Sequence, residues 1–125
     1  MAVADTVTAG KVTSKIVIGA GGGRLPEIII YDSVLSKISK RFFADNKKLS
    51  GELNLTVGDV NGDSTPEIIV VLNAGKNKQV KTFNLAGKLL SQFKVSAGFN
   101  LNPMSVGAAD VDFDGADEIV LMNRE

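Results

Sequence analysis

Short apolar segments separated by polar turns recur along the chain, and they predict an all-β fold. Segments of this length that are rich in Val, Ile, Leu and Phe are typical of strands, and the Asn, Gly and Asp residues between them are typical of turns. We therefore expect antiparallel strands joined by short connections. The clearest such segments are residues 54–60, 67–73, 79–85 and 88–96.

Two segments are apolar at consecutive positions instead of alternate ones. They read EIIVVL at 67–72 and DEIVLM at 117–122. A strand of this kind is buried on both faces, as happens when sheets stack face to face. Segment 89–95 differs, because polar residues interrupt its apolar ones. We expect it to form an outer strand that is partly exposed to water.

The strand pattern repeats at intervals of 51 and 52 residues, because Ile16 aligns with Ile68 and Ile68 aligns with Ile119. A period near fifty is typical of β-propeller blades of four antiparallel strands. The chain is therefore interpreted as about two and a half blades, or about ten strands. The predicted division is residues 1–52, 53–103 and 104–125. Since propellers close with about four to eight blades, we expect oligomerisation or the rest of a larger propeller to close the ring.

One nine-residue loop occurs twice, with oxygen-bearing side chains at its first, third, fifth and ninth positions. The copies are DVNGDSTPE at 59–67 and DVDFDGADE at 110–118. Carboxylates that converge in a turn repel each other unless a cation lies between them. Ca²⁺, which takes about six to eight oxygen ligands, suits such a loop better than Mg²⁺, which demands stricter octahedral geometry. The alternative is a turn in which Asp and Asn bind only loop amides. An EF-hand is disfavoured, because helices flank its loop and its bidentate Glu stands later.

The start of the first repeat carries a degenerate form of the same loop. Residues 7–15 stand at the equivalent place, but they include no carboxylate, and Lys11 and Lys15 replace two of the acids. We expect a loop here that binds no metal.

The stretches VGDVNGDSTPEIIV (57–70), GAADVDFDGADEIV (107–120) and IVIGAGGGRLPEIIIYD (16–32) resemble the FG-GAP or VCBS-repeat β-propellers, which are related to the integrin α-chain propeller. In that family the loop joins the first two strands of a blade and binds Ca²⁺. The ligands are side chains at the first, third, fifth and ninth positions and the main-chain carbonyl of the seventh. The resemblance thus implies Asp59, Asn61, Asp63, the Thr65 carbonyl and Glu67 in one loop, and Asp110, Asp112, Asp114, the Ala116 carbonyl and Glu118 in the other.

The resemblance also implies a function. It indicates a calcium-stabilised, non-catalytic module, secreted or at the cell surface, that binds proteins or glycans in adhesion. Two alternatives stay open: a structural fragment that forms a closed ring by homo-oligomerisation, and a lectin or accessory domain of a secreted hydrolase. The first loop departs from the family pattern, because Ser64 replaces the usual Gly and Asn61 supplies no charge. We expect it to bind Ca²⁺ more weakly than the second.

The composition narrows the chemistry. The chain has 125 residues, of which 44% are hydrophobic, so it can form one domain with a core. It contains no Cys and no His, which excludes disulfides, thiolate metal sites and His-based catalytic triads. Carboxylates could serve glycoside hydrolysis as an acid and base pair, but their crowding in two loops is better explained by a cation. The opening residues lack the features of an intact signal peptide, and no apolar stretch approaches the ~18 residues of a membrane span.

The remaining charges favour a solvated surface over an anionic partner. Seven of the fourteen acids occupy the alternate loop positions, which leaves seven acids against fourteen basic residues elsewhere. Scattered lysines of this kind keep strand edges soluble, so no nucleic-acid partner is expected. Three other signals are given structural interpretations: the Gly-rich segment 19–24 as a strand connection, Lys37, Lys40, Arg41, Phe42 and Phe43 as an outer strand, and Phe99, Asn100 and Asn102 as a connection between repeats.

Overall fold

The computed structural model describes residues 2–8, 11–20, 25–32, 37–46, 53–74, 77–95 and 104–123, which form ten strands and no helix. The prediction of an all-β fold is therefore confirmed for these residues. The strands are β1 (Ala2–Thr8), β2 (Lys11–Ala20), β3 (Glu27–Asp32), β4 (Ile38–Phe43), β5 (Leu53–Gly58), β6 (Glu67–Ala74), β7 (Asn77–Phe83), β8 (Leu89–Lys94), β9 (Met104–Ala109) and β10 (Glu118–Asn123).

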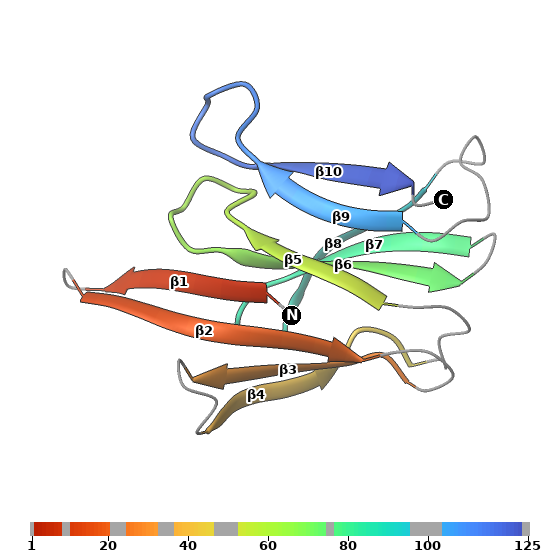
Figure 1. The fold of residues 1–125 in the computed structure, drawn as a ribbon, viewed down its shortest axis with the longest axis horizontal. Coiled ribbons are helices and arrows are strands. Elements are labelled where there is room, and N and C mark those ends of the chain that lie inside the picture. Colours follow the sequence, from red (N-terminus) through yellow and green to blue (C-terminus); the bar gives the residue numbers. More distant parts are fainter. Residues whose placement is uncertain are drawn as a thin grey trace.

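The strands pair with their neighbours in sequence to give three antiparallel sheets. The first sheet has the order β1-β2-β3-β4, the second β5-β6-β7-β8, and the third contains β9 and β10. The sheets stack in layers, with the second between the other two (Figure 1). The opening strands β1, β5 and β9 lie next to one another along the stack. Within the described residues the stack is open, so the number of blades in a closed ring stays a prediction.

The second sheet is buried on both faces along β6. Ile68, Val70 and Leu72 face the first sheet, and Ile69 and Val71 face the third. All five side chains are at most 3% exposed. Full burial of one such side chain contributes about 1.5–3 kcal/mol. The consecutive apolar residues of segment 67–72 therefore fulfil their predicted role as a strand between two layers.

The first two sheets pack closely at Gly19 in β2. A Cβ atom at this position would lie 2.4 Å from Cδ2 of Leu53 and 2.6 Å from Cδ2 of Leu55, both on β5. Real Cβ atoms do not pack that closely, so a side chain here would force both leucine methyl groups to move. Gly19 belongs to the Gly-rich segment 19–24, which thus has a packing role at its start; residues 21–24 lie outside the described part of the chain.

Both four-stranded sheets contain an irregularity at the same place. The register of β3 against β4 shifts between Ile30 and Tyr31, and that of β7 against β8 shifts between Thr82 and Phe83. These positions are separated by the 52-residue offset found in the sequence. At each shift the outer strand, β4 or β8, has one residue more than its partner, as in a β-bulge. The repeat therefore extends to the details of strand pairing.

The third sheet differs from the expectation for its apolar segment. Ile119 and Leu121 of β10 pack toward the second sheet. Val120 and Met122, on the other face of β10, are 36% and 53% exposed. Burial on both faces was thus the wrong expectation for β10 in this chain, because no described layer covers its outer face.

The start of the first repeat also differs from expectation. A nine-residue loop was predicted at residues 7–15, but β1 continues to Thr8 and β2 begins at Lys11. Thr8 pairs with Lys11, and Asp5 pairs with Ser14. The physical reason is the missing cluster of carboxylates: a segment rich in Val and Thr favours a strand, and nothing there opposes continued pairing.

The last strand of each four-stranded sheet lies at the surface, as predicted. The side chains of β8 are all exposed, and those of β4 are exposed except for half-buried Phe42. Phe42 packs against Phe83 with ring centroids 5.0 Å apart. Arg41 forms a 3.1 Å ion pair with Glu27 on β3. The charge of Arg41 is therefore paired within its own sheet. Phe99, Asn100 and Asn102 lie outside the described residues.

None of the described segments forms a helix that is long and apolar enough to cross a membrane.

Candidate metal sites

The first acidic loop connects β5 to β6 and is organised around Asp59. The Asp59 carboxylate accepts hydrogen bonds from three backbone N–H groups of the same loop, those of Gly62 at 2.9 Å, Asp63 at 3.1 Å and Ser64 at 2.7 Å. The loop thereby wraps around its first residue, and the later side chains turn toward the same point.

The other polar side chains of this loop each bind one amide. Asn61 Oδ1 accepts from the Asp63 N–H at 3.1 Å, and Asp63 Oδ1 accepts from the Thr65 N–H at 2.9 Å. Glu67, at the start of β6, is 2% exposed and accepts from the Val60 N–H at 3.0 Å. These bonds leave further carboxylate lone pairs for other partners, since an ionised carboxylate has about four acceptor sites.

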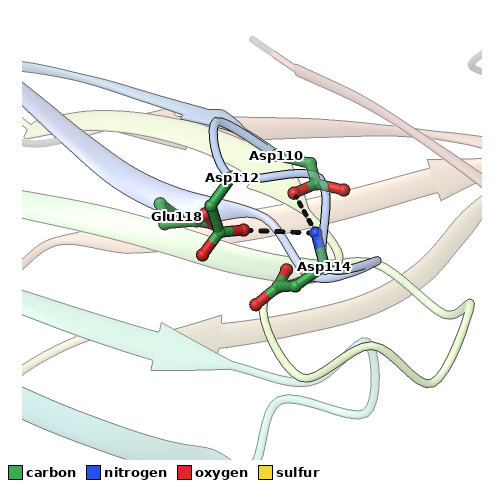
Figure 2. A group of neighbouring side chains, drawn as sticks. All are labelled: Asp110, Asp112, Asp114 and Glu118. Atoms are coloured by element: carbon green, nitrogen blue, oxygen red, sulfur yellow. Dashed lines mark hydrogen bonds between the residues drawn. The ribbon is translucent and has the colours of Figure 1, made fainter.

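The second acidic loop connects β9 to β10 and repeats four of the bonds of the first loop. Figure 2 shows the two that the Asp114 N–H donates. Asp110 accepts from the N–H groups of Asp114 at 3.1 Å and Gly115 at 3.0 Å. Asp112 accepts from the Asp114 N–H at 3.2 Å, and Asp114 accepts from the Ala116 N–H at 2.9 Å. Two segments that share only part of their sequence therefore adopt one geometry.

The backbone of the two loops matches as well. The fourth and sixth residues of both are left-handed: φ is 77° at Gly62 and 69° at Ser64, and 59° at Phe113 and 92° at Gly115. Left-handed residues reverse the chain twice within three positions, which is how neighbouring side chains come to face one centre. A non-glycine residue in this region is strained, and each loop accepts one.

Each loop brings carboxylate oxygens close enough to share an ion. One oxygen from each acid lies within 4.8 Å of the others, both for Asp59, Asp63 and Glu67 and for Asp110, Asp112, Asp114 and Glu118. The structure therefore brings together all the acids predicted as ligands. Asn61 lies in the same loop through its bond to Asp63. The Thr65 and Ala116 carbonyls stay predictions as ligands.

Glu118 supplies the test of whether a cation fits. Its residue is half-buried, but Oε1 is fully enclosed and has no hydrogen-bond partner. A buried oxygen without a hydrogen-bond partner is unfavourable, and more so when it carries charge. Figure 2 shows this carboxylate beside that of Asp112. A bound cation would give the orphaned oxygen a partner, so the residues present fit a metal ion.

Titration of the two glutamates reflects the same crowding. Burial raises the pKa of Glu118, and the neighbouring carboxylates of Asp112 and Asp114 raise it further. Burial also raises the pKa of Glu67, although the bond from the Val60 N–H opposes this change. Without a cation, both sites resist full ionisation.

Asp117 is a residue at this site that the sequence analysis did not single out. It is the eighth residue of the second loop, outside the alternating acids, and its carboxylate accepts from the Asp59 N–H of the first loop at 3.0 Å. The available signal was an additional acid where the first loop has Pro66. Nothing in the spacing showed that it would act on a residue 58 positions away.

The antiparallel sheets and the recurring acidic loop together define a β-sheet repeat protein. A family model described as FG-GAP-like repeat matches residues 59–121, just over half of the chain. The chain belongs to the FG-GAP-like repeat family. The match begins at Asp59 and ends in β10, so it includes both acidic loops and confirms the resemblance found in the sequence. Comparison with curated proteins and with solved structures gave no match.

Proposed function

We propose that the chain is a calcium-stabilised β-propeller module that binds protein or glycan ligands outside the cell and performs no catalysis. The observation that carries the metal assignment is the unpaired buried Oε1 of Glu118 among three aspartates. Oxygen-only ligands from short acidic side chains suit Ca²⁺. Extracellular Ca²⁺ modules of this kind work at millimolar calcium, which supports a location outside the cell.

The proposed role of the ion is mechanical. Ca²⁺ would be held by Asp110, Asp112, Asp114 and Glu118, and by Asp59, Asn61, Asp63 and Glu67 in the first loop, with the Thr65 and Ala116 carbonyls as further ligands. It would cancel the repulsion among the carboxylates and fix the connection between two paired strands. Binding to the folded form alone adds about 2.7 kcal/mol of stability per site at a hundredfold excess over the dissociation constant.

Calorimetry tests this assignment. The melting temperature is measured in calcium, in magnesium and in chelator. We expect the highest value in calcium, because Mg²⁺ binds poorly to sites that cannot offer octahedral geometry. Equal melting temperatures in calcium and chelator would reject the metal assignment.

The binding role is supported by a hollow of about 300 Å³ that is lined by Leu25, Phe43, Asp45 and Asn46. The start of β3 and the end of β4, which flank these residues, lie at the opposite end of the sheets from the β5–β6 and β9–β10 connections (Figure 1). An exposed aromatic ring beside polar side chains suits a sugar, which also fits a lectin or accessory domain. Binding to a glycan array, lost in Phe43→Ala, is the expected result; no binding to any glycan would restrict the proposal to protein ligands.

A second candidate is a structural ring made of several copies of the chain. It is favoured by the apolar residues Val120 and Met122, which are exposed on the outer face of the third sheet. Covering such a face would remove apolar surface from water at about 25 cal/mol per Å². Light scattering in calcium distinguishes the candidates: a single defined oligomer supports the ring, and a monomer rejects it.

A further inference from the structure

The two acidic loops are joined to each other by a pair of reciprocal hydrogen bonds. The Asp59 N–H donates to Oδ2 of Asp117 at 3.0 Å, and the Asp117 N–H donates to the Asp59 carbonyl oxygen at 2.7 Å. Both bonds connect the first residue of one loop with the eighth residue of the other. The loops therefore form one hydrogen-bonded unit, although they belong to different sheets.

Close packing reinforces this connection. A Cβ atom at Gly58, the residue before Asp59, would lie 2.8 Å from Asp117 Oδ2 and 2.5 Å from Cβ of Ala108. Gly58 is also buried. A Cβ at Gly62 would contact Cβ of Ala116 and the Gly115 carbonyl, both at 3.7 Å. The second loop therefore lies against the first at two points, with no room for a side chain at Gly58.

The position of Asp59 gives this contact its importance. Asp59 is the residue whose carboxylate binds three amides of its own loop, so its placement sets the shape of that loop. Asp117 fixes both the N–H and the carbonyl of Asp59. Asp117 also directly precedes Glu118, the last acid of the second site. An ordered second loop therefore holds Asp59 in place.

The first loop has no equivalent of Asp117. In the first loop the eighth residue is Pro66, which has neither a backbone N–H nor a carboxylate. The first loop cannot make the equivalent pair of bonds to an earlier segment. Asp117 can therefore couple the two loops to each other. Pro66 cannot couple the first loop to an earlier part of the chain in the same way.

We propose that Asp117 is a positioning residue that couples the two loops, so that Ca²⁺ in the second loop strengthens Ca²⁺ binding in the first. This inference rests on the proposed calcium function. An ion in the second loop draws its four repelling carboxylates together and orders Asp117. The first loop then loses less freedom when it binds its own ion, which is positive coupling through ordering.

The test measures each site separately in the full chain. Calcium is titrated while the amide NMR signals of Gly62 and Gly115 are followed, since each donates to the first carboxylate of its own loop. Asp112→Ala removes a ligand oxygen of the second loop, whereas Asn would only reproduce the residue that the first loop has at Asn61. We expect Asp112→Ala to weaken calcium binding at Gly62 about fivefold, the lower end of usual coupling strengths.

Variants of Asp117 identify the route. Asp117→Ala is expected to weaken binding at Gly62 by a similar factor, and adding Asp112→Ala should then cause little further loss. Asp117→Asn keeps an oxygen that can accept from the Asp59 N–H, so coupling should be restored. Simple destabilisation by Asp117→Ala would not remove the dependence on Asp112, which separates positioning from a general structural role.

The outcomes distinguish this inference from the proposed function. If neither glycine signal responds to millimolar calcium, the calcium function is wrong. If both respond but binding at Gly62 is the same with and without Asp112→Ala, calcium binding stands and the coupling is overturned. If Asp117→Ala leaves the coupling intact, the loops are coupled through another route and the role of Asp117 is overturned.

Discussion

The two acidic loops reach one geometry with different residues at their strained positions. The first has Gly62 and Ser64 at the two left-handed positions, and the second has Phe113 and Gly115. Four of the side-chain bonds to loop amides nevertheless recur in both, such as those from Ser64 to Asp59 and from Gly115 to Asp110. The comparison teaches that the alternating oxygens determine the loop, and that the glycines only lower its cost. It also shows a difference in charge, since three carboxylates gather in the first loop and four in the second.

The largest expected effect comes from neutralising the ninth residue of either loop. With calcium in hundredfold excess, Glu118→Gln should remove most of about 2.7 kcal/mol of stability, and Glu67→Gln should remove less, because we expect the first loop to bind more weakly. In chelator Glu118→Gln should instead increase the stability, since the uncharged side chain no longer repels Asp112. Thermal unfolding in both buffers measures this. Glu27→Gln, an acid outside the loops, is the control and should behave alike in both.

A smaller effect is expected from filling the space between the loops. Gly58→Ala places a methyl group against Ala108 and Asp117, and overpacking of this kind costs about 1–3 kcal/mol. Gly107→Ala is the matched control in β9, because a Cβ there has nothing within 4 Å. Urea unfolding should separate the two variants clearly. Equal stability of the two variants would show that Ala108 and Asp117 can move to accommodate the methyl group at little cost.

The effect of pH on the free energy of unfolding should also have opposite signs with and without calcium. In chelator, the raised pKa values of Glu67 and Glu118 mean that the folded form holds protons more strongly than the unfolded chain. The stability that these two glutamates contribute is therefore fully present below their ordinary pKa of 4.5. It is lost as the pH rises through their raised pKa values. With calcium the opposite holds, because the ion binds the ionised carboxylates. The difference in unfolding free energy between wild type and Glu67→Gln/Glu118→Gln, measured across this range in both buffers, checks the signs.

The smallest effects concern the left-handed positions. Ser64→Gly and Phe113→Gly should each stabilise the folded chain by up to about 1 kcal/mol, because glycine relieves the left-handed strain but adds freedom to the unfolded chain. Gly115→Ala is the converse and should destabilise by about 1 kcal/mol. Chemical unfolding in chelator isolates the backbone effect from metal binding. A loss of stability in Phe113→Gly would mean that the exposed ring makes a compensating contact.

Much of the site was predictable because its chemistry is local. Acids at alternate positions of one short loop meet through bonds that span two to five residues, such as those of Asp59 to Asp63 and Ser64. The buried strand β6 was predictable for a similar reason, since consecutive apolar residues need two covered faces. The fold class followed from these local patterns.

The features that could not be predicted depend on distant parts of the chain. Asp117 acts on the backbone of Asp59 in another sheet, and spacing within a loop says nothing about such a contact. The exposure of Val120 and Met122 depends on which layers are present beside β10. The β1–β2 pairing was mistaken for a loop because alignment with the later repeats was given more weight than the strand preference of its own residues.

The matching bulges of β3–β4 and β7–β8 have a consequence for how the molecule can grow. Each lies beside the last strand of its sheet, and a bulged, twisted margin is a poor template for recruiting another ribbon. Lateral addition, the first step toward fibrous aggregates, is therefore discouraged in both sheets. A further sheet can join this molecule more readily by packing against the face of an existing sheet.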